Sequence, residues 1–380
     1  MKKTNKVEVK VAKTDREFVG IKIINDQAII TFPIGYNIKE EIIAVTETQK
    51  IRKLYEDVKI LMTTIEEAKE ELYETGYKKF SFSSAIFILE DYLKNGLYDV
   101  QEKQCKKKAK GKIIWKKTIQ EREPIYSAGN YIYLDTYHYN ICEIESKIAQ
   151  IQKYCLNISS GILGWLYNCS SIYDDHKCFS KEEMIYELLN ELNQVNEDRK
   201  KKVIEQMILF LNGTQTSLDG KEEFQVGSRY FNKVWENILR KQTYGLYKQK
   251  SCFPTTYYVI EKKIMNSKLL PDITIQKDKK IVIIDAKYYR QGELPASSDI
   301  CKQLFYGQYI MYENPNDRVI NIFMLPKKIT QVESTEGFFQ IGYANAEHLS
   351  EKHKILTYYL DTKSVMQNHK IIKKILLKYV

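Results

Sequence analysis

This sequence of 380 residues has few prolines and no closely spaced pair of cysteines. Seven cysteines are scattered along it, and none forms the C-x-x-C pair from which zinc ligands and redox sites are commonly built. Neither a disulfide framework nor a zinc site is therefore expected, and a reducing, cytoplasmic setting is the simplest prediction. Pro124 is the only proline between Pro33 and Pro254, so no proline-rich linker marks a domain boundary.

Several functional signatures are also missing. No apolar run approaches the roughly 18–20 residues that a membrane span needs, so we expect no membrane partner. The charged start, MKKTNKVEVKVAKTDREF, has no apolar core and does not predict a secretory signal. The motif G-x-x-x-x-G-K-[ST] is absent, so we expect any nucleoside triphosphate to be bound by another subunit. The five histidines form no H-E-x-x-H or similar metal-binding group.

Positive charge is abundant. Fifty-nine lysines and arginines against 49 acidic residues give a net charge of +10, which favours an anionic partner, nucleic acid first. A general bias towards lysine explains the charge equally well. The run KQCKKKAKGKIIWKKTI (103–119) contains no acidic residue, and we expect a basic loop that becomes a strand near Ile113. Such a loop either contacts phosphates or is simply solvated. Its candidate DNA contacts are Lys106, Lys107, Lys108, Lys110 and Lys112.

The apolar periodicity predicts an α/β (α+β) fold with a mixed central sheet flanked by helices. Residues 18–36 read as a hairpin that turns at Asn25 and Asp26, and Ser180 and Glu183 form a capping box at the start of a helix. Towards the C-terminus, helices, paired strands and a buried strand alternate, which is the order expected for such a sheet. Further helices are expected over 46–74, 82–96, 203–213, 229–241 and 298–313, a strand over 318–326, and a short helix at the C-terminus. We place a domain boundary at 178, between an N-terminal α+β region (1–178) and a C-terminal domain (179–380).

One predicted hairpin carries charges inside its most strand-like residues, LLPDITIQKDKKIVIIDAKYY (269–289). If its turn is centred between Asp278 and Lys279, Asp272 and Asp285 face each other with Cβ atoms roughly 5 Å apart. Lys287 lies two residues beyond Asp285 and therefore points to the same face. The three charged side chains are then expected to converge on one patch beside an apolar sheet.

Two facing carboxylates repel each other unless a cation lies between them. Mg²⁺ prefers oxygen ligands and keeps several waters, so Asp272, Asp285 and the carbonyl of Ala286 are the predicted ligands. Lys287 would hold or help to deprotonate an attacking water, as in metal-assisted phosphodiester hydrolysis. The alternative is an ordinary surface hairpin in which Lys287 pairs with the two aspartates.

The stretch PDITI…IVIIDAKYY resembles the signature of the PD-(D/E)XK nuclease superfamily, with Asp272, Asp285 and Lys287 in the catalytic positions. The resemblance implies two further active-site residues, Glu236 and Gln303. Alternatives are an exposed ion pair of Glu236 with Arg240 and a surface amide at Gln303. Four more stretches are similar to LlaJI-type restriction endonucleases and, more distantly, to McrC nuclease subunits: GKIIWKKTI (111–119), YFNKVWENIL (230–239), DICKQLFYGQY (299–309) and LDTKSVMQ (360–367).

The resemblance implies a Mg²⁺-dependent type II restriction endonuclease acting on double-stranded DNA. Residues 179–380 would form its nuclease domain, and residues 1–178 would recognise DNA and support dimerisation. A homodimer would supply two active sites for a double-strand cut, and a partner methyltransferase would protect the host sites. The alternatives are an McrC-like subunit that needs an McrB-like GTPase, and a non-catalytic nucleic-acid-binding protein on a nuclease fold.

Overall fold

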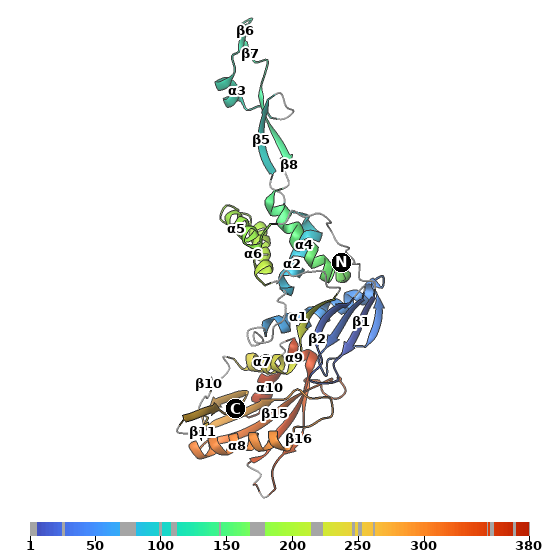
Figure 1. The fold of residues 1–380 in the computed structure, drawn as a ribbon, viewed down its shortest axis with the longest axis vertical. Coiled ribbons are helices and arrows are strands. Elements are labelled where there is room, and N and C mark those ends of the chain that lie inside the picture. The colour runs from blue at the N-terminus through green and yellow to red at the C-terminus, as the bar shows by residue number, and fades with distance from the viewer. Residues whose placement is uncertain are drawn as a thin grey trace. The chain divides into compact units, whose positions relative to one another are not determined.

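The protein divides into two compact units in a computed structural model (Figure 1). The first, which we call the sheet unit, comprises Met1–Ser83, Trp165–Asn168 and Thr216–Val380; the second, the helix–arm unit, comprises Ser84–Gly164 and Cys169–Gln215. The structure describes residues 6–24, 27–68, 81–98, 101–107, 112–143, 146–167, 179–213, 223–244, 248–249, 253–260, 263–347, 349, 353–367 and 370–379. The boundary predicted at 178 lies outside these residues and stays a prediction.

The sheet unit contains a five-stranded sheet in the order β4-β1-β3-β2-β9. Its strands are β1 (Lys6–Val11), β2 (Val19–Ile24), β3 (Gln27–Phe32), β4 (Glu41–Ala44) and β9 (Glu223–Ser228). The predicted hairpin is confirmed, because β2 and β3 pair antiparallel up to Ile24 and Gln27. The predicted turn residues, 25 and 26, lie outside the described residues. Burial alternates along β3, as expected for a strand with one face on the core.

A six-stranded mixed sheet, in the order β10-β13-β14-β15-β17-β16, forms the other half of the same unit. Parallel pairing joins β14, β15 and β17, and antiparallel pairing adds β13 and β16 at their sides. Both central strands, β14 and β15, are buried along nearly their whole length, since helices cover both faces. The strands are β10 (Lys248–Gln249), β13 (Ile273–Lys277), β14 (Lys280–Ala286), β15 (Arg318–Lys327), β16 (Phe338–Ala344) and β17 (Ile355–Asp361). The predicted mixed sheet flanked by helices is therefore confirmed.

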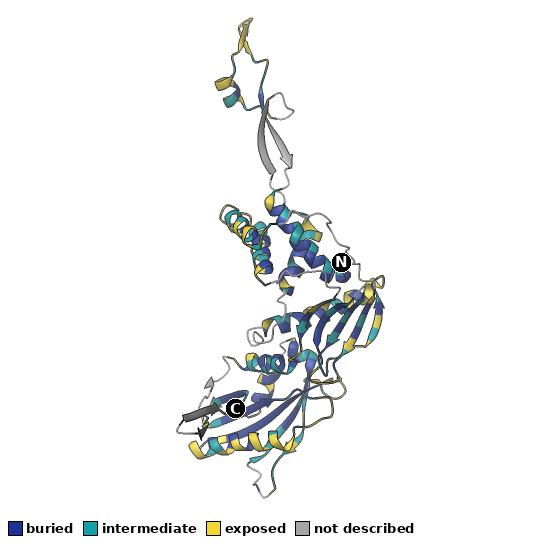
Figure 2. Ribbon diagram, in the orientation of Figure 1, coloured by how far each residue is buried: buried dark blue, intermediate teal, exposed yellow. Residues whose placement is uncertain are grey.

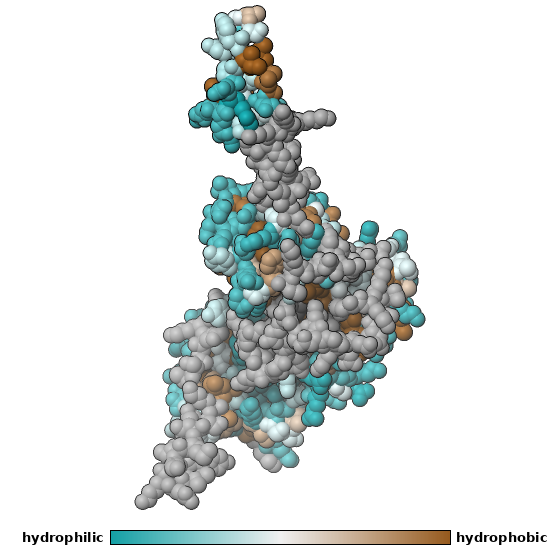
Figure 3. Space-filling model, turned by 45° about the horizontal axis from the view of Figure 1, so that its top comes forward, coloured by the Kyte–Doolittle hydropathy of each residue, from teal (hydrophilic) through white to brown (hydrophobic). Residues whose placement is uncertain are grey.

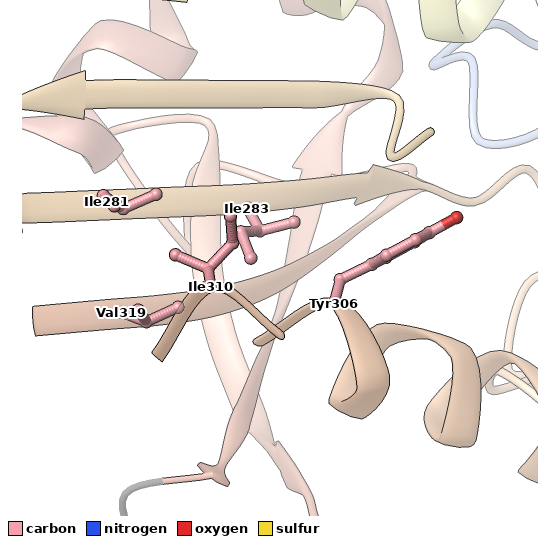
Figure 4. Packing of buried hydrophobic residues seen from close by; sticks show 5 residues of the cluster. All are labelled: Ile281, Ile283, Tyr306, Ile310 and Val319. Carbon is pink, nitrogen blue, oxygen red and sulfur yellow. The ribbon is translucent and has the colours of Figure 1, made fainter. Parts of the chain in front are cut away.

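Helix α8 (Ser297–Glu313) connects the parallel strands β14 and β15. Its Tyr306 and Ile310 pack on Ile281 and Ile283 of β14, together with Val319 of β15 (Figure 4). Helix α7 also contacts this sheet, where the Trp235 indole donates a hydrogen bond of 3.5 Å to the carbonyl of Met324. The remaining elements of the sheet unit are α1 (Thr48–Glu67), α7 (Phe231–Thr243), β11 (Thr255–Ile260), β12 (Lys263–Lys268), α9 (Thr362–Met366) and α10 (Ile371–Leu376).

The two sheets of this unit are joined by a short loop after β3. The backbone N–H of Ile34 donates to the hydroxyl of Tyr288 at 2.8 Å, and the Thr362 hydroxyl donates to the Ile34 carbonyl at 2.9 Å. Gly35 has a φ of +75°, and a Cβ there would lie 2.8 Å from the backbone of Lys327, so only glycine permits this approach. The N-terminal sheet thereby contacts the segment that directly follows Lys287.

The helix–arm unit begins with a group of helices. They are α2 (Phe82–Asn95), α4 (Lys147–Tyr167), α5 (Lys181–Leu192) and α6 (Asp198–Gly213). The predicted capping box is confirmed at the start of α5, where Ser180 and Glu183 exchange side-chain and backbone hydrogen bonds. Arg199 of α6 binds Asp91 of α2 through two hydrogen bonds of 2.9 and 2.8 Å. Among the described residues, no helix is both long and apolar enough to cross a bilayer.

The remainder of this unit, residues 101–143, we call the arm. It consists of β5 (Gln101–Lys107), α3 (Trp115–Glu121), β6 (Ile125–Ser127), β7 (Asn130–Ile132) and β8 (Tyr137–Glu143). The prediction of a basic loop followed by a strand is wrong here. The lysine-rich stretch starts as strand β5, because it pairs with β8, and only a single bridge to His138 remains at Ile113 before α3 begins. Figure 2 shows the exposed end of the arm, in contrast to the buried strands of both sheets.

Candidate active site

The hairpin β13–β14 has the predicted register. Ile273 faces Ile284 and Lys277 faces Lys280, so the turn lies at Asp278 and Lys279. Asp278 has a φ of +51°, a conformation that aspartate tolerates in tight hairpin turns. The same register sets Asp272, one residue before β13, opposite Asp285.

Asp272 is fixed at the end of β14. Its Oδ2 accepts a hydrogen bond of 2.7 Å from the backbone N–H of Ala286. Burial, followed by repulsion from Asp285 and Glu236, raises the pKa of Asp272 to about 8, although the bond from Ala286 acts in the opposite direction. The site therefore holds more acidic groups than it can keep ionised without a cation.

Lys287 lies between two carboxylates. Its Nζ is 2.9 Å from Oδ2 of Asp285 and 2.8 Å from Oδ1 of Asp299. Burial alone lowers the pKa of Lys287, but the ion pairs outweigh it and raise that pKa above its usual range. Asp285 is only 4% exposed and β14 is an interior strand, so this is not the surface hairpin of the alternative interpretation.

Glu236 lies half-buried on α7, and its charge contributes to the raised pKa of Asp272. One turn further along this helix, Nε of Arg240 donates to the backbone carbonyl of Asp272 at 3.4 Å. Helix α7 is thus brought against the start of the hairpin. Its amphipathic sequence buries Val234 and Trp235 beside Glu236, which places the acidic side chain at the rim of the core.

Gln303 is 1% exposed on α8 and is not a surface amide. Its Nε2 donates to the carbonyl of Ile283 at 3.1 Å, two residues before Asp285. Its Oε1 is buried and has no hydrogen-bond partner among the residues that the structure describes. The sequence-predicted residues Asp272, Asp285, Lys287, Glu236 and Gln303 therefore all lie around the end of β14, while their roles in a reaction stay predictions.

The sequence alone did not identify two residues of this site, Asp299 and Tyr289. Asp299 accepts hydrogen bonds from Lys287 and, at 2.7 Å, from the hydroxyl of Tyr289. Burial raises the pKa of Asp299, but these two bonds outweigh it and hold that pKa below its usual range. The available signal was helical spacing, since Asp299 precedes Gln303 by four residues and so shares its face of α8.

The donor set fits a divalent cation. Two carboxylates, that of the buried Asp285 and that of the half-buried Asp272 with its strongly raised pKa, would be relieved of their repulsion by Mg²⁺, which commonly uses one or two carboxylates and several waters. Ala286, the third predicted ligand through its carbonyl, ends β14 beside them. The described residues contain no group of three or more His, Cys, Asp or Glu side chains arranged for a metal, and the predicted set has only two carboxylates.

The lysines predicted to contact DNA lie on or after β5. Lys108 and Lys110 fall outside the described residues, and only the backbone of Lys106 and Lys107 is described. Lys112 is exposed. Their DNA contacts stay a prediction.

Comparisons with known proteins identify the family of the chain. The profile of the LlaJI restriction endonuclease family matches residues 18–372. A relative from Bacillus subtilis (strain 168), described as "Type II restriction enzyme BsuMI component YdjA", is 23% identical over 290 residues. That match covers 69% of this chain and 61% of the relative, so it spans less than two thirds of the relative's length. Because the family profile matches nearly the whole sequence, the chain belongs to the LlaJI restriction endonuclease family.

Proposed function

We propose that the chain is the Mg²⁺-dependent nuclease of a type II restriction system, and that it hydrolyses phosphodiester bonds of double-stranded DNA at a specific site. The observation that carries this proposal is the convergence of Asp272, Asp285 and Lys287 at the end of β14. Family membership supports the class of enzyme.

The mechanism assigns roles to the side chains of Asp272, Asp285, Lys287 and Glu236. Asp272, Asp285 and the Ala286 carbonyl would hold Mg²⁺, which supplies Lewis-acid activation of the phosphate and of water. Lys287 keeps its proton, because two carboxylates stabilise its charged form. It would therefore act as a hydrogen-bond donor to the attacking water or to a phosphate oxygen, and offset developing negative charge. Glu236 adds negative charge beside Asp272 and favours cation binding.

Cleavage of plasmid DNA with Mg²⁺, followed by run-off sequencing, tests the proposal and gives the recognition site and the stagger. Asp285→Asn and Lys287→Ala are expected to slow cleavage at least about 100-fold, the size of effect seen when one group that stabilises a transition state is removed. Ca²⁺ is expected to support DNA binding without cutting. Asp278→Asn and Lys279→Ala are matched controls at the exposed turn of the same hairpin.

Two results would contradict the proposal. Cleavage that is unchanged in both Asp285→Asn and Lys287→Ala would move the active site elsewhere. DNA binding by the wild-type protein with no cleavage under any condition would favour the non-catalytic nucleic-acid-binding alternative.

A second candidate is a nuclease subunit that cuts only with a nucleotide-hydrolysing partner. The arm favours it, because large apolar side chains are exposed there: Trp115, Ile119, Ile125, Tyr126, Tyr131, Ile132 and Leu134. Figure 3 shows apolar residues gathered at this end of the arm, and exposed apolar patches of this kind are typical of protein interfaces. The relative is also described as a component.

A cleavage assay with the purified chain alone separates the two candidates. Cutting without nucleotide or partner would contradict the subunit alternative, and cutting only with GTP and a GTPase subunit would support it. A homodimer and a partner methyltransferase belong to the first candidate. The homodimer is checked by the molar mass in solution. The partner methyltransferase is checked by protection of the mapped site on methylated DNA.

A further inference from the structure

Helix α8 presents a row of polar side chains to the end of β14. Asp299, Gln303 and Tyr306 follow at spacings of four and three residues and so share one face of the helix. Gln303 binds the Ile283 carbonyl, and Asp299 reaches Lys287. In Figure 4, Tyr306 extends along β14 from the packed residues Ile281 and Ile283. The helix therefore meets the active-site strand with apolar groups at one end and an acidic group at the other.

Asp299 is held by both of its oxygens. Oδ1 accepts from Nζ of Lys287 at 2.8 Å and Oδ2 accepts from the hydroxyl of Tyr289 at 2.7 Å. The backbone N–H of Asp299 also donates to the carbonyl of Ala296 at 2.9 Å. With one bond on each oxygen, the carboxylate has little freedom to rotate.

The ammonium of Lys287 has three protons to donate. One is directed to Asp285 at 2.9 Å and one to Asp299 at 2.8 Å. One donor remains. If Asp299 were absent, the ammonium would be drawn towards Asp285 alone and the direction of its remaining donors would not be fixed.

We propose that Asp299, held by Tyr289, is a positioning residue that orients the Lys287 ammonium so that its third proton faces the scissile phosphate or the attacking water. This inference rests on the proposed nuclease function. It adds a residue of α8 and one of the β14–α8 loop, Asp299 and Tyr289, to the residues on which cleavage depends. A merely structural role would instead predict that Asp299 contributes to stability alone.

Single-turnover cleavage, measured under the conditions in which the wild-type chain cuts, tests the proposal. Asp299→Ala is expected to lower the cleavage rate constant about 10- to 100-fold, as for other groups that orient a reacting residue. DNA affinity in Ca²⁺ is expected to stay within about twofold, since Lys287 itself is retained. Asp299→Glu should recover part of the rate, and Tyr289→Phe should lose less than Asp299→Ala. Glu313→Gln, which removes one exposed charge at the other end of α8, is the matched control.

The crystal structure of the Asp299→Ala protein is a second measurement that does not depend on activity. The proposal expects the Lys287 Nζ to leave its position between the two carboxylates. An unmoved Nζ, or a wild-type cleavage rate in Asp299→Ala while Lys287→Ala is inactive, would overturn the positioning role and leave the proposed nuclease function intact. Absence of cleavage by the wild-type protein, both alone and with a nucleotide-hydrolysing partner, would refute the nuclease function, and the crystal structure would then show only whether Asp299 holds the Lys287 ammonium in place.

Discussion

At the scale of single residues, the site is defined by charges that are placed where they cost stability. Asp285 is buried and the neighbouring Asp272 is half-buried, and like charges this close oppose ionisation. Ordinary surface hairpins avoid this by separating such groups or exposing them. The unfavourable pairing is understandable if a cation binds between the two carboxylates and the folded protein is more stable with the ion than without it.

Asp272→Asn tests this balance. Because the pKa of Asp272 rises from 3.8 to about 8 on folding, the unfolded state loses this proton first as the pH rises. The contribution of Asp272 to the free energy of unfolding therefore decreases as the pH rises from 3.8 to about 8. Asparagine keeps the shape and can accept the bond from Ala286, but carries no charge. At pH 8 without divalent ions we expect Asp272→Asn to have a higher Tm than the wild-type protein, by about 2–4 °C for each kcal/mol gained in the free energy of unfolding.

The same variant also reports on cation binding. Mg²⁺ or Ca²⁺ should raise the Tm of the wild-type protein in differential scanning fluorimetry and leave that of Asp272→Asn nearly unchanged. Asp278→Asn, at the turn of the same hairpin, should behave like wild type. A lower Tm for Asp272→Asn at pH 8, or an undiminished shift of its Tm with cation, would argue against the Asp272–Asp285 pair as the cation site.

At the scale of elements, the position of α8 on the sheet determines which polar groups reach β14. The close approach depends on Gly307, where a Cβ would lie 2.3 Å from Nδ2 of Asn321 on β15. Asn321 is 1% exposed, and its Oδ1 has no hydrogen-bond partner among the described residues. Since α8 carries Asp299 and Gln303, a shift of this helix would also displace the groups around Lys287.

Gly307→Ala is expected to destabilise the protein by roughly 1–3 kcal/mol, the usual range for overpacking a core, and to slow cleavage. If the clash with Asn321 is the cause, adding Asn321→Ala to Gly307→Ala should restore much of the lost stability and of the lost cleavage rate. The effects of the two substitutions would then be clearly non-additive in a double-mutant cycle. Glu313→Ala is the control for a change on an exposed part of the same helix. Additive losses in the double variant would assign the effect to something other than this contact.

At the scale of the whole molecule, the candidate active site lies in one unit, and the arm with its exposed apolar side chains lies in the other. The sheet unit combines the N-terminal 83 residues with the C-terminal part from Thr216 onwards. The arm of the helix–arm unit has 67% of Tyr126 and 70% of Tyr131 exposed, with the two rings 5.5 Å apart across the β6–β7 hairpin. Such a division fits the second candidate function, in which the proposed nuclease acts only with a partner bound elsewhere on the chain.

Replacing both of these tyrosines by serine tests that dependence. If the arm binds a partner subunit, Tyr126→Ser with Tyr131→Ser should leave the Tm nearly unchanged but weaken partner binding at least tenfold, and cleavage by the assembled system should fall with it. Tyr186→Ser, an exposed tyrosine of α5 in the same unit, is the control. Unchanged binding and cleavage by the double variant would exclude this part of the arm as the interface.

The sequence by itself determined the hairpin and its register. The turn at Asp278 and Lys279 and the apolar run before Asp285 are local signals, and a hairpin of fixed turn length has only one register. The convergence of Asp272, Asp285 and Lys287 followed from the period of two along a strand. The family resemblance added Glu236 and Gln303, which local spacing alone did not assign to the site.

Only the tertiary structure decided which distant segments meet. The lysine-rich segment of β5 was predicted to be a loop because its lysines favour solvent, and its pairing with β8 depends on partners 30 or more residues away. The contact of Ile34 with Tyr288 and that of Asp299 with Lys287 likewise bring together segments that no local pattern connects. The physical reason is that spacing within a strand or a helix fixes which side chains share a face, whereas the packing of one element on another fixes what that face touches.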